Sequence, residues 1–171
     1  MTAENIFAFS QSKAGLLAAR EYLSGAMHLD NLIAVRLSRL DLVRSRATRV
    51  TRMLDGMPGS VQYSDLLGET TAELADLETE LLQDYQRLLQ RQKEIDAAIR
   101  RIPDEEQRAV LEMRYLQQKS FASIAIRLSY EERQIYRLHK KGLCHIAAQM
   151  AAGEILWENF DELLQAQEMR V

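Results

Sequence analysis

Candidate chemistry in this sequence concentrates in a cluster of basic and polar side chains within residues 131–150. Arginine offers a planar fork that matches the edge of a base, and lysine offers a point charge that suits a phosphate. The cluster therefore predicts contact with double-stranded DNA, although a charged helical face can also be merely solvated. The candidates for reading bases are Glu132, Arg133, Tyr136 and Arg137. The candidates for contacting phosphates are Gln134, His139, Lys140 and Lys141.

The pattern around this cluster is that of a helix-turn-helix. We expect a supporting helix over 104–118, a short helix over 121–128, a tight turn at Ser129-Tyr130 and a longer helix over about 131–152. Such a motif places the N-terminal part of its second helix in the major groove, so the base-reading candidates precede the two lysines. The expected core of the motif consists of Phe121, Ile124, Ala125, Leu128, Tyr130, Ile135, Leu138 and Leu143.

Two long segments with a seven-residue repeat precede this motif and must position it. They are predicted helices over 16–54 and 65–102, separated by the glycine- and proline-containing stretch 55–60. The repeated apolar positions are Ala26, Ile33, Leu40, Ala47 and Leu54 in the first helix and Leu74, Leu81, Leu88, Ile95 and Ile102 in the second. The companion stripe of the second helix is expected at Glu78, Tyr85, Gln92 and Ile99. This pattern predicts an antiparallel helical hairpin.

The apolar face of such a hairpin is wider than one partner helix can cover. We therefore expect a homodimer in which two hairpins form a four-helix bundle, and the alternative is that the chain's own ends cover this face. Pro103 marks the end of the hairpin because proline cannot continue the helix. The sequence thus predicts an all-α protein with four regions: a flexible or partly ordered N-terminus (1–15), a hairpin assembly domain (16–102), a helix-turn-helix DNA-binding domain (103–152) and an acidic amphipathic C-terminal helix (153–171).

Charge is distributed unevenly along the chain. There are 22 Lys and Arg against 25 Asp and Glu, and this net charge of −3 argues against a uniformly basic surface. By segment, 1–60 and 103–150 are net basic, whereas 61–102 and 151–171 are net acidic. The arginines of the first long helix could pair with the acidic second helix or contact DNA phosphates, and the opposite charges favour pairing. These arginines are Arg36, Arg39, Arg44, Arg46, Arg49 and Arg52.

Other kinds of function have little support in the sequence. Cys144 is the one cysteine and is adjacent to His145 rather than at a metal-site spacing, so we expect no disulfide, metal or cofactor. No glycine-rich phosphate loop or hydrolase motif occurs, which predicts that the protein is not an enzyme. No secretion signal and no run of about 18 apolar residues occurs, which predicts a cytoplasmic protein without a membrane partner.

Residues 102–146 resemble region four of sigma factors. The shared positions are Pro103, Leu111, Arg114-Tyr115, Ile124-Ala125, Leu128, Ile135 and Leu143. The sequence departs at Ser129, where sigma factors usually have glycine, and at Glu131, where serine or threonine usually caps the recognition helix. The resemblance implies a DNA-binding helix-turn-helix and makes RNA polymerase a further candidate partner.

Over a longer span of about residues 20–146, the chain is similar to small sigma-like phage proteins of Gram-positive bacteria, related in organisation to the ArpU-like late transcriptional regulators. The similarity lies in Tyr22-Leu23, Leu29-Asp30, Arg46-Ala47-Thr48, Thr51, Arg114-Tyr115-Leu116 and Tyr136-Arg137-Leu138-His139. It implies regulation of phage or prophage genes. The one tryptophan is Trp157, and the first hundred residues show no aromatic cluster for promoter melting, so we expect an activator or adaptor.

Two hypotheses of other classes are also consistent with the sequence. A small-terminase-like packaging protein would recognise DNA with the helix-turn-helix and build a ring with the hairpin. An interaction protein would instead bind RNA polymerase or a host factor through the sigma-like module. Oligomer order and the salt dependence of DNA binding distinguish the three hypotheses.

Overall fold

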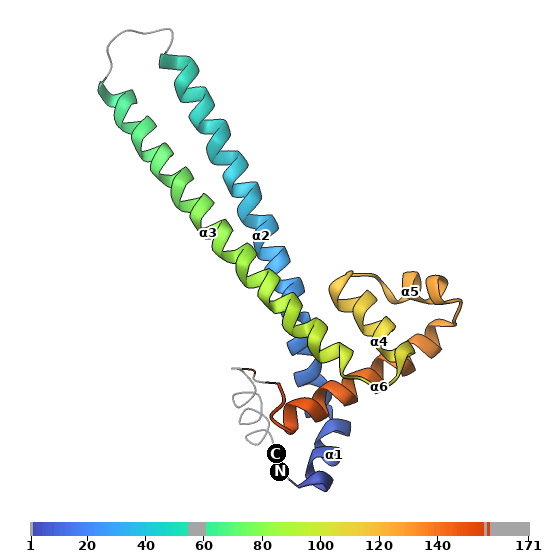
Figure 1. The fold of residues 1–171 in the computed structure, drawn as a ribbon. Coiled ribbons are helices and arrows are strands. Elements are labelled where there is room, and N and C mark those ends of the chain that lie inside the picture. The colour runs from blue at the N-terminus through green and yellow to red at the C-terminus, as the bar shows by residue number, and fades with distance from the viewer. Residues whose placement is uncertain (1, 55–60, 156, 158–171) are drawn as a thin grey trace. The chain divides into compact units, whose positions relative to one another are not determined.

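The structure is a computed structural model that describes residues 2–54, 61–155 and 157. These residues form helices and contain no β-strand, which confirms the predicted all-α class. None of the helices in the described residues is long and apolar enough to cross a membrane. In chain order the elements are α1 (Ala3–Gln11), α2 (Lys13–Leu54), α3 (Val61–Arg100), α4 (Glu105–Leu111), the π-helix η1 (Glu112–Leu116), α5 (Phe121–Leu128) and α6 (Glu132–Ala151) (Figure 1).

The chain divides into two compact units. We call the first the head unit, which comprises Met1–Met27 and Arg91–Val171, and the second the arm unit, which comprises His28–Gln90. Helices α2 and α3 contribute residues to both units, whereas α1, α4, η1, α5 and α6 belong to the head unit. The head unit therefore combines the N-terminus, one end of the predicted hairpin and the predicted helix-turn-helix.

In the arm unit, α2 and α3 run antiparallel and pack along an apolar seam (Figure 1). Both helices place large apolar side chains at intervals of three, four or seven residues, which gives each helix one apolar stripe. The buried members are Ile33, Leu40 and Val43 on α2 and Leu77, Leu81 and Leu88 on α3.

In the arm unit, the companion stripe of α3 lies one residue away from its predicted position, whereas in the head unit Ile99 is buried as predicted and Gln92 is half-buried. Glu78 and Tyr85 are exposed, whereas Leu77 and Asp84 are buried. The prediction that Glu78 and Tyr85 belong to the seam is therefore wrong. Asp84 can occupy a seam position because Arg36 reaches it from α2 and supplies the opposite charge.

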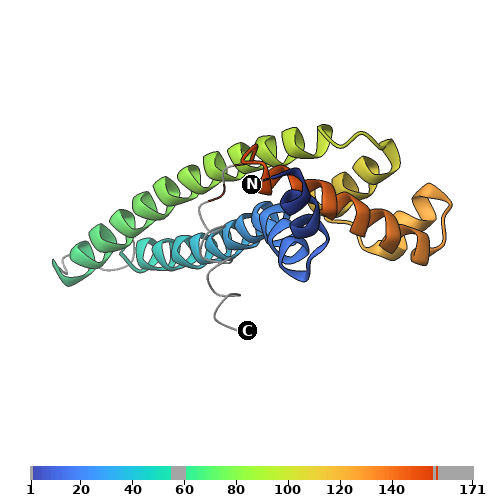
Figure 2. The ribbon, with the colours of Figure 1, turned by 90° about the horizontal axis from the view of Figure 1, so that it is seen from below.

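The N-terminal segment was expected to be flexible or partly ordered over 1–15, but the structure places most of it in α1 and the first turn of α2. Between these helices, Ser12 Oγ accepts a hydrogen bond from the Gly15 amide at 3.0 Å and donates one to the Phe9 carbonyl at 2.7 Å. A Cβ at Gly15 would lie 2.2 Å from the Phe9 carbonyl oxygen, so only glycine allows this corner. Helix α1 packs against α6 (Figure 2). A helix of this length is not stable alone in water, so the contact with α6 is what stabilises α1.

The predicted supporting helix over 104–118 is divided in the structure. Asp104 caps α4 by accepting a hydrogen bond from the Gln107 amide at 3.0 Å, and the chain then continues from α4 into η1. Helix α5 has the predicted bounds, and α6 is one residue shorter at each end. The predicted acidic helix over 153–171 lies outside the described residues apart from 153–155 and 157, which are not helical.

Candidate nucleic-acid interface

Elements α4, η1, α5 and α6 share a small apolar core in the head unit. Its buried members are Val110, Met113, Ile124, Ala125, Ile135 and Leu138, against which Ala109, Phe121 and Leu128 pack partly buried. Leu143 is buried as well. These contacts hold one face of α6, and they include every residue that the sequence assigned to the core of the helix-turn-helix except Tyr130.

The connection between α5 and α6 consists of Ser129, Tyr130 and Glu131. Ser129 has a φ of 57°, in the left-handed region that favours glycine, and it ends α5. The side chain of Tyr130 is 38% exposed, and its hydroxyl donates to Glu106 Oε1 at 2.5 Å. The prediction that Tyr130 fills the core is therefore wrong, because its hydrogen bond attaches the turn to the surface of α4 instead.

The opposite face of α6 carries the basic side chains. The exposed members of the predicted interface are Glu132, Arg133, Tyr136, Arg137, Lys140 and Lys141. Its four cations occur at i, i+4, i+7 and i+8, so they share one side of the helix. Gln134 is half-buried and accepts a hydrogen bond from the Arg137 guanidinium. In the part of the chain that the structure describes, none of the four cations forms a salt bridge.

His139 lies on α6 but not on this exposed face, since only 5% of its surface is accessible. Its Nε2 lies 3.0 Å from the Tyr115 hydroxyl, and its ring meets the Phe121 ring edge-on with 5.0 Å between centroids. Burial, assisted by the charges of Arg20 and Arg114, lowers the pKa of His139 from 6.5 to about 4, so the ring is neutral at pH 7. The prediction that His139 contacts a phosphate is therefore wrong, and its role is to attach α6 to η1.

The π-helix η1 positions Arg114 and Tyr115, which the resemblance to sigma factors singled out without assigning them a contact. Arg114 donates to the Lys119 carbonyl at 2.9 Å, and its guanidinium lies 5.0 Å from the centre of the Phe121 ring. Burial raises the pKa of Tyr115 to about 12, so its hydroxyl keeps its proton near His139. Isolated π-turns are often found at functional sites, and this one fixes the elements on which α6 rests.

A close approach between α4 and α6 sets the position of the basic helix. A Cβ at Gly142 would lie 2.9 Å from Cδ1 of Leu111, which is fully buried. Any larger residue at this position would push the two helices apart or displace the leucine. The absence of a side chain at Gly142 is thus part of how the exposed face of α6 is presented.

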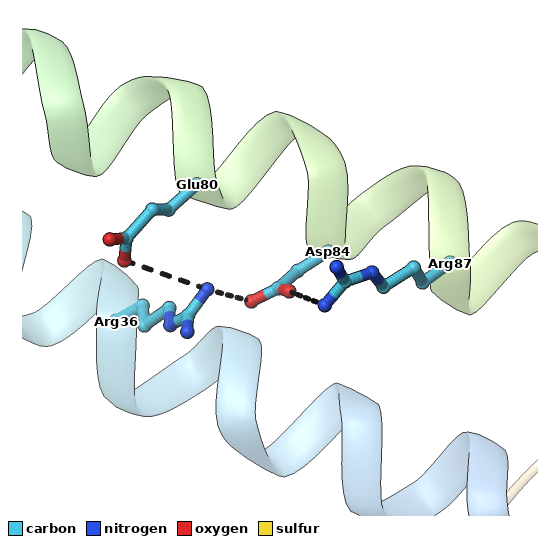
Figure 3. Close-up of polar contacts among 4 residues, drawn as sticks. All are labelled: Arg36, Glu80, Asp84 and Arg87. Atoms are coloured by element: carbon cyan, nitrogen blue, oxygen red, sulfur yellow. Dashed lines mark hydrogen bonds and ion pairs between the residues drawn. The ribbon is translucent and has the colours of Figure 1, made fainter.

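Three arginines of α2 lie in a different setting from those of α6, whereas Arg46, Arg49 and Arg52 are exposed and form no salt bridge within the described residues. In the arm unit, Arg36 pairs with the buried Asp84 and lies 3.7 Å from Glu80, and Arg87 approaches Asp84 at 3.6 Å (Figure 3). Two exposed pairs, Arg39–Glu73 at 2.9 Å and Arg44–Glu78 at 2.8 Å, also join α2 to α3. Of the two interpretations that the sequence offered, these three arginines follow the pairing one.

Metal ligation has no cluster to support it in the described residues, where no group of three or more histidine, cysteine, aspartate or glutamate side chains could hold an ion. Cys144 is a half-buried free thiol, and burial raises its pKa, so it stays protonated at neutral pH.

Comparison with known proteins gives one match. A family model described as a protein of unknown function (DUF1492) matches residues 66–146, from the arm unit part of α3 through most of α6. No curated protein and no solved structure matches the chain. The description of the family names no activity, so a function for this chain has to be argued from its own residues.

Proposed function

We propose that this protein is a sequence-specific double-stranded DNA-binding regulator of transcription, an activator or sigma-like adaptor of phage or prophage genes, which reads the major groove with α6. The observation that carries the proposal is the exposed face of α6, where Arg133, Arg137, Lys140 and Lys141 share one side and form no salt bridge within the described residues. The resemblance of residues 102–146 to region four of sigma factors supports the same interpretation.

Recognition would begin at the N-terminal half of α6. Arg133 and Arg137 lie one turn apart, so both guanidinium groups can reach base edges in one groove, and a bidentate contact with guanine is worth about 1–3 kcal/mol of discrimination. Glu132 can accept from cytosine and Tyr136 can contact a neighbouring base edge or sugar. Lys140 and Lys141 follow where a recognition helix leaves the groove, and there they would contact phosphates.

The buried neighbours of α6 would serve this function by fixing the helix before DNA arrives. The contact between His139 and Tyr115 and the close approach of Gly142 to Leu111 hold α6 on η1 and α4. A recognition helix that is already fixed loses less conformational entropy on binding than a mobile one.

Assembly is the second part of the proposal, and we assign it to a homodimer formed through the arm unit. Leu82, Tyr85 and Leu89 of α3 are all exposed and occur at i, i+3 and i+7, which is the spacing of a coiled-coil seam. A second copy packed on this stripe would present two α6 helices to DNA, as dimeric helix-turn-helix proteins do. RNA polymerase is a further partner that the sigma-like resemblance suggests for the head unit.

The DNA proposal is tested by selecting a duplex from a random pool with the full-length protein and measuring its affinity by fluorescence anisotropy over a range of salt. We expect Arg133→Ala and Arg137→Ala each to weaken binding of the selected duplex about tenfold or more, since each removes a base contact. Arg39→Ala is the matched control, because it removes one arginine from an arm unit salt bridge, and it should keep the wild-type affinity. Unchanged affinity in both α6 variants would contradict the proposal.

The same measurements distinguish the other hypotheses. Affinity that falls steeply with salt indicates contact with phosphates, because each neutralised phosphate contributes a slope of about 0.9. A protein that binds no duplex with such a dependence would instead act by binding a protein. Light scattering measures the molar mass of the assembly. A mass of many subunits, as a closed ring requires, would favour DNA packaging, and the mass of a dimer would favour regulation.

A further inference from the structure

A cavity of about 470 Å³ lies in the head unit where α1 and α4 meet α6. Ligand pockets in proteins usually measure about 300–1,000 Å³, so it is large enough for a small organic molecule. Five of its lining side chains decide what it could hold: Phe7 of α1, Gln107 of α4, and Lys140, Lys141 and His145 of α6.

The charge of the lining favours an anion. Lys140 and Lys141 bring two ammonium groups to the cavity, His145 adds an imidazole ring, and none of the described residues that line it is acidic. A phosphate monoester carries a charge of about −1.5 to −2 at neutral pH, which matches two lysines better than the single charge of a carboxylate.

Gln107 supplies a hydrogen-bond acceptor that the rest of the described residues leave unused. Its side chain is 6% exposed, its Nε2 donates to Asp104 Oδ2 at 3.0 Å, and its Oε1 is buried without a hydrogen-bond partner among the described residues. Hydrogen bonds from Gln107 keep the pKa of Asp104 below its usual value, so Asp104 stays a carboxylate and holds Nε2 on its side of the amide. Oε1 is then the polar atom of Gln107 without a partner in the described part of the chain, but it is shielded from solvent, so a donor in the cavity reaches it only when the side chain turns.

The apolar part of the lining favours a planar body. The ring of Phe7 is 66% exposed although it lines the cavity, so it offers an uncovered aromatic surface for stacking. Ala148 of α6, which also lines the cavity, leaves space rather than filling it. A flat ring with an N–H donor could therefore stack on Phe7 and reach toward Gln107.

We propose that this cavity binds a small organic phosphate of the nucleoside monophosphate class, with the phosphate on Lys140 and Lys141, the base against Phe7 and a base N–H directed to Gln107. The proposal has a regulatory consequence that rests on the proposed function. Lys140 and Lys141 are also the residues assigned to the DNA backbone, so a nucleotide in the cavity and a DNA duplex would compete for them.

Binding is tested on the full-length protein without DNA, by isothermal titration calorimetry with adenosine monophosphate, adenosine and inorganic phosphate as separate probes. We expect saturable binding of adenosine monophosphate, and binding about tenfold or more weaker for each of the other probes, because each lacks half of the contacts. The absence of saturable binding of adenosine monophosphate at millimolar concentration would overturn the proposal, and so would equal affinity for all three probes.

Variants separate the cavity from general charge. Lys140→Ala with Lys141→Ala should weaken adenosine monophosphate about tenfold or more, and Ala148→Leu should weaken it by filling the cavity while keeping both lysines. The matched control is Lys13→Ala with Lys93→Ala, two lysines that do not line the cavity, and it should bind as the wild type does. Thermal melts establish that each variant is folded, and an equal loss in the control double variant would overturn the proposal.

Competition is measured with the duplex selected above. Adenosine monophosphate should raise the apparent Kd for that duplex in the wild type and leave it unchanged in Ala148→Leu. Nucleotide binding that leaves duplex affinity unchanged would overturn the competition, whereas a protein that binds the nucleotide and no duplex would contradict the proposed function while leaving the cavity proposal supported.

Discussion

Two helices of this chain carry similar arginine side chains in opposite electrostatic settings. On α2, Arg36, Arg39 and Arg44 each lie within 4.0 Å of a carboxylate of α3. On α6, Arg133 and Arg137 are exposed and form no salt bridge within the described residues. The number of arginines does not reveal which of them are unpaired, since α2 contains more arginines than α6.

The difference lies in what each guanidinium would give up to bind something else. Arg36, Arg39 and Arg44 must each first lose a carboxylate, and for Arg36 this would leave the buried Asp84 without its main partner. On α6, Arg133 would lose only water, and Arg137 would lose in addition its hydrogen bond to Gln134. The three paired arginines of α2 are therefore suited to holding the arm unit together, and the unpaired arginines of α6 are suited to the recognition that we propose.

The strongest test of this contrast is Arg36→Ala. Asp84 is 1% exposed, and removing one partner of a buried pair typically costs about 3–5 kcal/mol, so we expect a loss of about 3 kcal/mol in the free energy of unfolding. Arg87, at 3.6 Å from Asp84, keeps the loss at the lower end of that range. Urea denaturation followed by circular dichroism measures it.

Two controls give that loss a cause. Replacing both partners, Arg36→Met with Asp84→Leu, should restore most of the stability, because an apolar pair of similar volume needs no desolvated charge. Arg133→Ala should change the free energy of unfolding by less than about 0.5 kcal/mol, as is usual for surface substitutions. A double variant as unstable as Arg36→Ala would show that lost packing, and not the unpaired carboxylate, causes the effect.

A second prediction concerns His139, the one predicted phosphate contact of α6 that is buried and neutral instead of exposed. Burial lowers the pKa of His139 to about 4 from 6.5, so between these values the unfolded chain binds a proton that the folded chain does not. The free energy of unfolding should therefore be fully retained above pH 6.5 and fall by on the order of 3 kcal/mol as the pH decreases to about 4.

The comparison variant for this pH effect is His139→Gln, which keeps a polar partner for the Tyr115 hydroxyl but does not titrate. Its stability should change less with pH over the same range, whereas His28→Gln, at an exposed position of the arm unit, should keep the wild-type dependence. Identical pH profiles for the wild type and His139→Gln would mean that His139 is accessible, and it would return to the set of candidate phosphate contacts.

How much the sequence could predict differs between the two units. In the arm unit, the seven-residue repeat was sufficient to predict both helices and the burial of Ile33, Leu40 and Leu81, because periodicity reports directly which face is covered. It failed at Asp84, whose burial depends on Arg36, 48 residues away in the chain. A pattern of apolar residues has no means of marking a charged residue that is buried by its partner.

In the head unit the failures have the same physical origin. Helix α5 was predicted with its correct bounds, because its ends are set by local capping at Ser120 and by the turn at Ser129. His139 was assigned to the exposed face because its neighbours are basic, but its position is decided by Tyr115, 24 residues earlier. Helix α1 was not predicted, because its order depends on packing against α6.

A pair of glycine substitutions extends the contrast from charge to packing. Gly142→Ala would bring a Cβ to 2.9 Å from Leu111, and we expect a loss of about 1–3 kcal/mol together with weaker DNA binding, because α6 must shift. Gly68→Ala on α3 meets no atom within 4 Å and should stabilise the protein by about 1 kcal/mol through helix propensity alone. Thermal melts and the anisotropy assay measure both effects, and a neutral Gly142→Ala would show that the helices can separate without cost.

The smallest expected effect belongs to the exposed pair Arg44–Glu78, whose side chains are 55% and 56% accessible. Such pairs contribute about 0–1 kcal/mol, and dissolved salt screens them. A double-mutant cycle with alanine at both positions should therefore give a coupling energy below about 1 kcal/mol. This coupling energy should fall as salt is added. The same cycle at Arg36 and Asp84 should give a larger coupling energy with little salt dependence, because that carboxylate is removed from solvent. If the two cycles gave equal energies, burial would not be what ties the arginines of α2 to the arm unit. An exposed arginine such as Arg44 would then be held as firmly as Arg36, and the presence of a carboxylate partner alone would distinguish the paired arginines of α2 from the unpaired arginines of α6.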